Sequence, residues 1–553
     1  MRMFRSEVVG FLVAALALAP QVGAQQQANR WAAPKCDLKP AHYLVNSGLL
    51  YLKSATETKF EDQKQKDLRD ARGVLTQALT TGSQDKNPAA WYYLARYYIL
   101  TQDLVGADSA FQRAQTLKPD CSDDITIWRR FVWVPLLNAG IAAWQANNTD
   151  SAIASFRRAN AILKTEPMGF KYLASLLYNK GAGQAPDTAA LTGTCRTERA
   201  RTKPGTPSDS IASECKTFVL ERWQEYKTAT DSAAAYFRIA ADISAKDPKY
   251  QQDRRDALFN LARIRHSQKR WPEAEALYRE YLTVVPNDPE AMASLGSVLS
   301  QTGQRDSAFV LYRRIIARGD SMGSTPLFRV GVEIFQGVSD PPDTAASGGT
   351  CRTEARTNRQ LTPGRIRARC DSVTKATMRD YDGAASVTYR LAAQAFAAGL
   401  KVNPYSRDGL YNLVNAYLQL NDSTGMLPVA QRLVSVDPMN RMSLRFLAFA
   451  HQRVGHVDST LHYLRMADST LSADVTISEF SPEDQSAHIK GLVTNVRSTP
   501  GQPFKLVFEF LNTKGEVVAT QSADIPAIAP QETHQIDLKV IGAGIQAWRY
   551  HKE

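Results

Sequence analysis

The sequence has no apolar run long enough to cross a membrane. Its apolar stretch from Val8 to Ala19 is about a dozen residues long, whereas a spanning helix needs about 20. A permanent membrane anchor is therefore disfavoured, and no transmembrane segment is expected in the mature chain. Two arginines precede the stretch, and the small-residue ending Val22-Gly23-Ala24 follows it. This order predicts a secretory signal peptide over residues 1–24.

Motifs that carry catalytic chemistry are also missing. The chain has no Walker-type Gly-Lys-Ser/Thr loop, no His-Glu-x-x-His pair and no Gly-x-Gly-x-x-Gly turn. The Cys-x-x-Cys spacing of zinc and redox sites is absent as well. The nearest approach to a metal cluster is His451, His456 and His462, for which structural roles are favoured. We therefore expect no enzyme, catalytic residue, metal or cofactor; an active site of unrecognised type is the alternative.

The cysteines are few and even in number. The six of them suggest pairs because two bracket one segment, two bracket another, and two are left over. The pairs that we expect are Cys195 with Cys215, Cys351 with Cys370, and Cys36 with Cys121. Free buried thiols are the alternative. Disulfides form in oxidising compartments, so they and the signal peptide together predict a periplasmic or secreted protein.

The charge balance is basic, with a net charge of +12 and a pI near 9.3. In a cytosolic protein this balance would suit nucleic acid. However, charges of both signs are interspersed along this chain, and no nucleic-acid-binding motif occurs. Because export is predicted too, we expect no nucleic-acid partner. Acidic lipids, glycans or acidic proteins are the partners that the charge favours.

A repeated pattern organises most of the chain. Between Pro88 and Pro119 the spacing of apolar residues predicts two amphipathic helices joined by a short turn. The residues that carry this pattern are Trp91, Leu94, Ala95, Tyr98, Ala107, Phe111 and Ala114. The small alanines let the second helix approach the first closely. Pro119 cannot continue the helix and so starts the next unit.

This pattern resembles the tetratricopeptide repeat, whose consensus has large, Leu, small and Tyr positions in its first helix and Ala, Phe, Ala and Pro in and after its second. Other segments that keep the register are Leu258 to Pro286, Met292 to Ile315, Leu410 to Pro438 and Leu444 to Ala467. We therefore expect a mainly α fold. After a linker at residues 25–37, about nine helix pairs would form a right-handed α-solenoid over residues 38–472.

A longer period of roughly 150 residues lies on top of the first. The motif Asp187-Thr-Ala-Ala190, which leads to Cys195, recurs as Asp343-Thr-Ala-Ala346, which leads to Cys351. A block has thus been duplicated together with an insertion. The two insertions, 181–215 and 338–371, are rich in Gly, Pro, Thr and Arg and lack helical periodicity. We expect both to be loops closed by cysteines.

Arginines make the second insertion strongly basic. They are Arg352, Arg356, Arg359, Arg365, Arg367 and Arg369. A solvated loop is one interpretation of this cluster. The other is an arm that grips an acidic partner.

After Asp474 the spacing of apolar residues changes from helical to alternating. Short alternating runs with polar turns predict a small antiparallel β-sandwich over residues 473–553. The stretch from Phe508 to Val518 resembles the FxLYD family of immunoglobulin-like bacterial domains, with an aromatic-rich strand, a turn with Gly and a Val-Val strand. The resemblance implies a binding or spacer module that carries no catalytic residue.

In proteins with tetratricopeptide repeats the first helices line a concave groove, and the resemblance implies which side chains point into it. Carried over residue by residue, they are Tyr92, Arg96, Phe259, Asn260, Arg263, His266, Tyr411, Asn412, Asn415 and Arg445. Asn and Arg can bond the backbone of an extended peptide, and aromatic rings can cover apolar side chains. The alternative is that Phe259 and Tyr411 pack between repeats.

These features together predict an exported, non-enzymatic scaffold. It would hold a protein or peptide partner in the solenoid groove and act in cell-envelope assembly. The alternative is a factor that binds envelope polysaccharide or another anionic polymer through the basic insertions.

Overall fold

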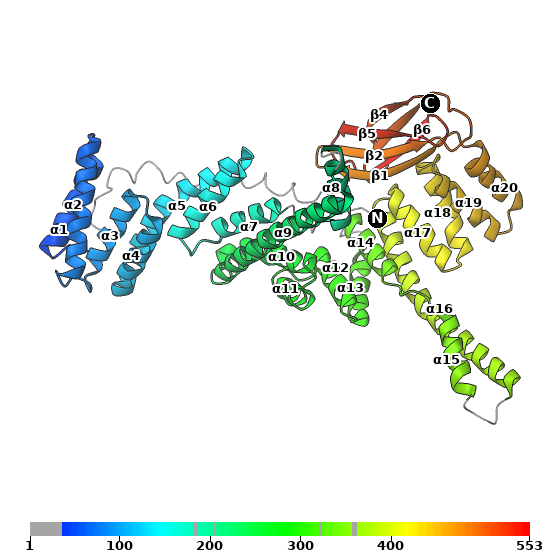
Figure 1. The fold of residues 1–553 in the computed structure, drawn as a ribbon, viewed down its shortest axis with the longest axis horizontal. Helices are drawn as coiled ribbons and strands as arrows, with labels where there is room; N and C mark the ends of the chain where they lie inside the picture. Colours follow the sequence, from blue (N-terminus) through cyan, green and yellow to red (C-terminus); the bar gives the residue numbers. More distant parts are fainter. Residues whose placement is uncertain (1–35, 182–185, 203–205, 320–322, 357–361) are drawn as a thin grey trace. The chain divides into compact units, whose positions relative to one another are not determined.

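The computed structural model describes residues 36–181, 186–202, 206–319, 323–356 and 362–553 (Figure 1). The predicted signal peptide and nearly all of the predicted linker lie outside these residues. The chain divides into two compact units, of which one ends at Pro286 and the other begins at Asn287. We call them the N-terminal and C-terminal units. In the described part of the chain, no helix combines the length and the apolar character that crossing a bilayer requires.

Helices build the whole described part of the N-terminal unit. They are α1 (Tyr43–Glu57), α2 (Glu61–Thr80), α3 (Pro88–Leu100), α4 (Leu104–Leu117), α5 (Ser122–Gln145), α6 (Thr149–Ile162), α7 (Pro167–Lys180), α8 (Thr188–Thr202), α9 (Ser208–Ser244), α10 (Gln251–Ser267) and α11 (Trp271–Val284). Five pairs pack against each other: α1 with α2, α3 with α4, α5 with α6, α7 with α9, and α10 with α11.

The C-terminal unit continues with α12 (Pro289–Gln301), α13 (Arg305–Arg318), α14 (Ser324–Gln336), α15 (Thr344–Arg356), α16 (Pro363–Val402), α17 (Arg407–Gln419), α18 (Ser423–Val436), α19 (Arg441–Arg453) and α20 (Val457–Arg465). Its pairs are α12 with α13, α14 with α16, α17 with α18, and α19 with α20. The described residues of both units thus hold nine such pairs. The predicted fold class, mainly α with a small terminal sandwich, is confirmed.

The turn between the two helices of a pair keeps one backbone geometry in many of the repeats. Its second residue has a positive φ: 62° at Gln102, 58° at Asn147, 57° at Lys269, 81° at Gly303, 55° at Asn421 and 81° at Gly455. A residue in this left-handed region ends the first helix and redirects the chain. The recurrence of the same turn shows that the pairs are copies of one structural unit.

Close contact within a pair depends on a small residue that faces an aromatic ring. A Cβ atom added to Gly140, Gly296 or Gly331 would come closer than 3.0 Å to the rings of Phe156, Tyr312 or Phe396, respectively. In each case the glycine lies on the first helix and the ring on the second. The absence of a side chain therefore sets how closely the two helices approach.

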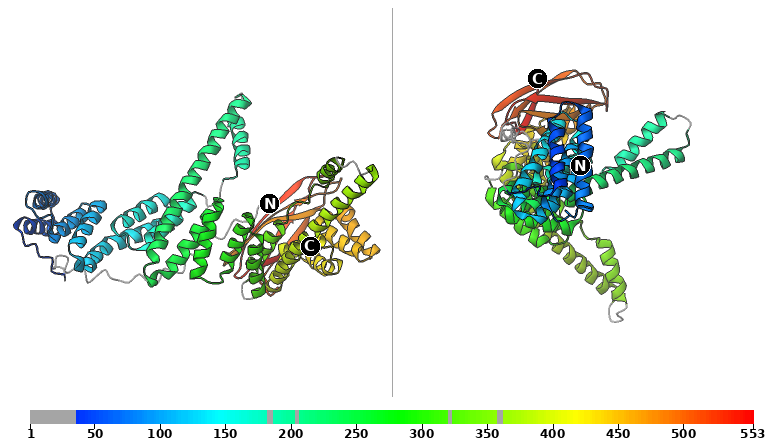
Figure 2. Two further views of the ribbon diagram at one scale, coloured as in Figure 1. Left: turned by 90° about the horizontal axis from the view of Figure 1, so that it is seen from below. Right: turned by 90° about the vertical axis from the view of Figure 1, so that its left-hand side faces the viewer.

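Both insertions are helical hairpins, so the expectation of loops was wrong. We call the hairpin of the first insertion the first arm and that of the second insertion the second arm. In the first arm, α8 packs on the first half of α9; in the second arm, α15 packs on the first half of α16. Figure 2 shows each arm leaving the helix stack of its own unit. Only a few apolar side chains line the first hairpin, namely Cys195, Ile211 and Cys215 with Phe218 beside them. Such a thin core leaves little helical periodicity in the sequence.

Three disulfides are present: Cys36–Cys121, Cys195–Cys215 and Cys351–Cys370. These are the pairs that the cysteine positions predicted. The second and third each join the two helices of one arm, whereas the first ties the start of the described chain to the residue just before α5.

The C-terminal sandwich consists of β1 (Asp474–Pro482), β2 (Ser486–Thr494), β3 (Phe504–Leu511), β4 (Val517–Ile525), β5 (Thr533–Ile541) and β6 (Ala547–Lys552). It forms two antiparallel sheets with strand orders β1-β2-β5 and β4-β3-β6. Leu506, Phe508 and Phe510 alternate along β3 and are fully buried between the sheets. This is the period of two that a half-buried strand requires.

The sandwich and the last repeats share one apolar core, which includes Met439 and Leu444 from the helical part. Polar contacts complete the contact surface. The Tyr550 hydroxyl donates to Asp437 at 2.9 Å and accepts from the Met439 N–H at 3.1 Å. The sandwich is therefore packed onto α18 and α19 of its unit and is not a separate module on a linker (Figure 1).

Candidate functional site

Two of the residues predicted to line the groove lie in the core of the N-terminal unit. Tyr92 is 1% exposed, and its ring lies 5.9 Å from that of Phe111. Burial raises the pKa of Tyr92 to about 12. Arg96 is 5% exposed, and its guanidinium lies 3.7 Å from the centre of the Trp128 ring. The expectation that these two side chains face a partner was wrong, because α5 begins early enough to lay Trp128 over α3.

The four groove candidates of α10 are half-buried and mostly serve their own repeat. Phe259 contacts the rings of two tyrosines of α11, and His266 contacts Trp271 and Tyr278. The Asn260 amide donates to a backbone carbonyl one turn earlier. Arg263 lies 6.0 Å above the Phe259 ring. Phe259 therefore packs within its own repeat in these ring contacts, whereas the packing alternative had placed it between repeats.

In the C-terminal unit the candidates fall on two neighbouring first helices. Tyr411 of α17 packs against Phe446 of α19, with ring centres 5.2 Å apart. Asn412 and Asn415 lie half-buried on the same helix. Arg445 of α19 is exposed and forms an ion pair with Asp468 at 2.6 Å. Tyr411 thus joins two repeats, while Arg445 reaches the surface.

Arg445 belongs to a larger exposed row on α19, which sequence reasoning missed. Met442 is 44% exposed and Phe449 is 37% exposed. The residues Met442, Arg445, Phe449 and Arg453 follow one another at intervals of three and four, so they share one helix face. Arg453 lies 5.1 Å over the Phe449 ring. The signal was available in the sequence. Met442 and Phe449 occupy the second and ninth positions of the repeat, and the resemblance to the tetratricopeptide repeat implies that side chains at both positions point into the groove.

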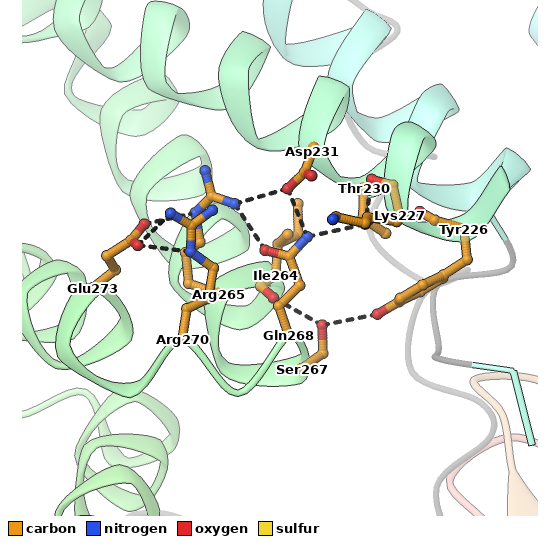
Figure 3. Close-up of polar contacts among 10 residues, drawn as sticks. All are labelled: Tyr226, Lys227, Thr230, Asp231, Ile264, Arg265, Ser267, Gln268, Arg270 and Glu273. Carbon is orange, nitrogen blue, oxygen red and sulfur yellow. Dashed lines mark hydrogen bonds and ion pairs between the residues drawn. The ribbon is translucent and has the colours of Figure 1, made fainter. Parts of the chain in front are cut away.

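A polar network ties the root of the first arm to the following repeat (Figure 3). Asp231 of α9 accepts from Arg265 at 3.2 Å and from Gln268 at 3.0 Å. Arg265 also contacts Glu273 of α11 at 3.1 Å. Opposite charges and an amide fill the space between α9 and the turn that joins α10 to α11.

The duplicated block has a hollow of about 510 Å³ where this network would lie. Aligned on Phe237 and Phe396 in the long helices and on Leu261 and Leu413 in the following repeats, Asp231, Arg265 and Gln268 correspond to Arg390, Tyr417 and Leu420. The hollow is lined by Arg390, Ala393, Gln394, Ala397, Tyr417, Leu420, Asn421 and Asp422. Substitution of the acid by an arginine and of the amide by a leucine has removed the polar tie, so the root of the second arm is less filled.

Two of the three histidines noted in the sequence contact each other. The Nδ1 atoms of His451 and His456 lie 3.2 Å apart, and the His451 ring stacks on Tyr463. Burial lowers the pKa of His451, and the nearby His456 adds to the effect. Across the ranges that the structure describes, no three His, Cys, Asp or Glu side chains are grouped so that they could hold a metal ion.

Comparison with known proteins agrees with the repeat assignment. Residues 62–120 and 230–292 match the family described as tetratricopeptide repeat. The chain therefore contains tetratricopeptide repeats, which act as scaffolds with extended binding surfaces. No curated protein matches the sequence.

Several solved structures are similar to part of this chain over most of their own length. One is described as the crystal structure of MamA protein (13% identity, 38% of this chain and 89% of that chain, TM-score 0.26). Another is the apo form of RapI (11% identity, 77% and 95%, TM-score 0.28). A third is PilW, described as a type IV pilus biogenesis factor (18% identity, 50% and 94%, TM-score 0.19). Scores this low carry no argument about function.

Proposed function

We propose that this chain is an exported, non-enzymatic scaffold that binds a protein partner on the exposed face of its first helices and acts in cell-envelope assembly. The observation that carries the proposal is the α19 row of Met442, Arg445, Phe449 and Arg453. Met, Phe and Arg are enriched at protein interfaces. Their exposure together on one helix face gives a partner both apolar area and charge.

The neighbouring helix supplies polar groups. Asn412 and Asn415 lie on α17, which contacts α19 through the ring pair of Tyr411 and Phe446. An Asn side chain can donate to and accept from a peptide backbone. The surface therefore suits a segment that offers an apolar side chain to Phe449 and an acidic group to Arg453, since Arg445 already pairs with Asp468. The sandwich, which we propose to be FxLYD-like, would hold this surface in place from the other side of α19.

The three disulfides support the proposed location. Disulfides persist in oxidising compartments and are rare in the cytosol. The periplasm or the exterior of a bacterial cell meets this condition, and the signal peptide predicted at residues 1–24 agrees with it.

Site-specific photo-crosslinking tests the proposed surface. A photoreactive amino acid would be placed at Phe449, and as a control at Val310, which is 62% exposed on the second helix α13. We expect one specific adduct from Phe449 in the native cell envelope and none from Val310. The double variant Met442→Ala and Phe449→Ala should lower partner recovery without loss of stability, because both side chains are exposed. Equal adducts at both positions would contradict the proposal.

A second candidate partner is an anionic polymer of the envelope, such as an acidic polysaccharide. It is favoured by the exposed arginines of the second insertion, of which Arg352, Arg365, Arg367 and Arg369 have described side chains. Removal of residues 345–370 should then abolish retention on an acidic polysaccharide column at low salt. Unchanged retention would reject this candidate and leave the α19 surface untouched.

A further inference from the structure

The two arms are copies of one hairpin and can be compared residue by residue. Each consists of two helices joined by one disulfide. An isoleucine stands four residues before the second cysteine in both, at Ile211 before Cys215 and at Ile366 before Cys370. These anchors fix the register of the first turns of α9 against those of α16. The first cysteines, Cys195 and Cys351, fix the register of α8 against α15.

In this register the charges of the two arms differ. The residues five, three and one before the second cysteine are Ser210, Ala212 and Glu214 in the first arm, and Arg365, Arg367 and Arg369 in the second. Four residues after the first cysteine, the first arm has Arg199 and the second has Ala355. The second arm has therefore gained three arginines and lost both members of a charge pair.

The first arm uses that pair internally. The Arg199 Nε atom lies 3.5 Å from a carboxylate oxygen of Glu214, across the two helices. At the equivalent place in the second arm, Ala355 is 7% exposed and Arg369 points to solvent. Arg352, Arg365 and Arg367 are exposed as well. Among residues with described positions, no acidic side chain forms an ion pair with any of these four arginines, so they are available to an external anion.

We infer that the second arm alone carries a binding site for a linear acidic polysaccharide, formed by Arg352, Arg365, Arg367 and Arg369. We call these residues the arginine tip. The inference deepens the second candidate function above and rests on it. A guanidinium forms paired hydrogen bonds with a carboxylate or sulfate group. The Cys351–Cys370 disulfide holds the two helices of the tip together, which lowers the entropy that binding costs.

The placement of the arginines favours a flexible linear polymer. Arg365 and Arg369 lie one turn apart on one flank of α16, whereas Arg367 lies two residues from each and so on the opposite flank. A polymer that carries an acidic group on each unit can contact both flanks, but a flat protein surface cannot. In the described residues of 344–372, no large hydrophobic side chain is exposed. Apart from Val373, which is 43% exposed one residue beyond this range, the described part of the hairpin around the tip offers no large apolar group to insert into a lipid surface.

The first arm supplies the substitutions for the test. In the full chain, Arg365→Ser, Arg367→Ala and Arg369→Glu give the second arm the residues that its copy already tolerates. Binding to immobilised polygalacturonate at low salt should weaken by about tenfold or more, because the affinity of a basic cluster for an anionic polymer rises steeply with the number of its positive charges. The matched control is Arg305→Ser, Arg313→Ala and Lys66→Glu, which changes the net charge equally outside the arms and should leave binding nearly unchanged.

The reciprocal change tests sufficiency. The first-arm variant Arg199→Ala, Ser210→Arg, Ala212→Arg and Glu214→Arg should increase binding, and circular dichroism would check that all variants keep their helix content. Neutral dextran should bind none of them. An unchanged affinity after the second-arm exchange, an equal loss in the control, or binding to anionic lipid vesicles but not to polygalacturonate would overturn the inference. Crosslinking at Phe449 in the second-arm variant keeps this outcome separate from that of the protein-scaffold proposal.

Discussion

At the residue scale, single glycines decide how closely paired helices approach. Gly296 of α12 faces the Tyr312 ring of α13, and Tyr312 is almost completely buried. A glycine inside a helix normally lowers stability relative to alanine. Its presence here therefore points to a steric requirement, which the spacing of the ring confirms.

We predict that Gly296→Ala destabilises the C-terminal unit by about 1–3 kcal/mol, because overpacking of a filled core outweighs the better helix propensity of alanine. Gly383→Ala in α16 is the matched control, since an added Cβ there meets nothing within 4 Å. That change should leave stability equal or slightly higher. Chemical denaturation of both variants measures the difference. A Gly296→Ala variant as stable as the control would contradict the proposed packing rule.

The contact between His451 and His456 predicts that the stability of the fold depends on pH. Because the folded-state pKa of His451 is below the ordinary value of 6.5, the unfolded chain takes up the proton at higher pH than the folded chain. Stability is therefore fully present above about pH 7 and is lost as the pH falls through the lowered pKa. Thermal midpoints of the wild type and His451→Gln should converge on acidification. His551→Gln, at an exposed position of β6, should run parallel to the wild type.

At the scale of elements, the arms show how a helix can form with little apolar periodicity. The described part of the first hairpin buries only a small cluster around one disulfide. A hairpin with so few buried side chains is marginal by itself. The cross-link between its helices and its continuity with the long helix α9 or α16 offset this weakness.

We predict that the double variant Cys351→Ala and Cys370→Ala loosens the second arm while the repeats persist. The cross-linked residues are 19 apart in sequence, and closing a loop of this size stabilises by about 3 kcal/mol in the chain-entropy model. Hydrogen exchange should accelerate over α15 and the first turns of α16, and not over α17 to α20. Replacing Cys36 and Cys121 by alanine should leave exchange of the second arm unchanged. Protection of α15 that survives in the first variant would show that the disulfide is dispensable.

At the scale of the whole molecule, the sandwich packs along the last repeats of its unit. It shares one apolar core with Met439, just before α19, and with Leu444 of α19, and β6 contacts α17 and α18. Asp437 is fully buried at this junction and accepts from Arg407 at 2.9 Å as well as from Tyr550. Burial beside Asp437 raises the pKa of Tyr550, so its hydroxyl keeps its proton.

We predict that Tyr550→Phe lowers the unfolding free energy of the C-terminal unit by about 1–3 kcal/mol, because it leaves the buried Met439 N–H without its acceptor and Asp437 with one donor fewer. Tyr381→Phe is the control; its hydroxyl donates to the Ser339 carbonyl at an exposed site, where water can take over. Denaturation midpoints of the two variants should differ accordingly. Equal stability would show that the junction does not depend on this hydroxyl.

The sequence by itself determined the repeat unit, the switch to strands after Asp474 and the cysteine pairs, because each rests on spacing along the chain. Tertiary structure alone decided which positions of the repeat are open. Tyr92 and Arg96 occupy groove positions of the repeat but are covered by Trp128. Met442 and Phe449 are exposed on α19, the first helix of the last pair. The helices of the arms also could not be predicted from the sequence, because their apolar periodicity is weak. A disulfide and the continuation into a long helix stabilise them.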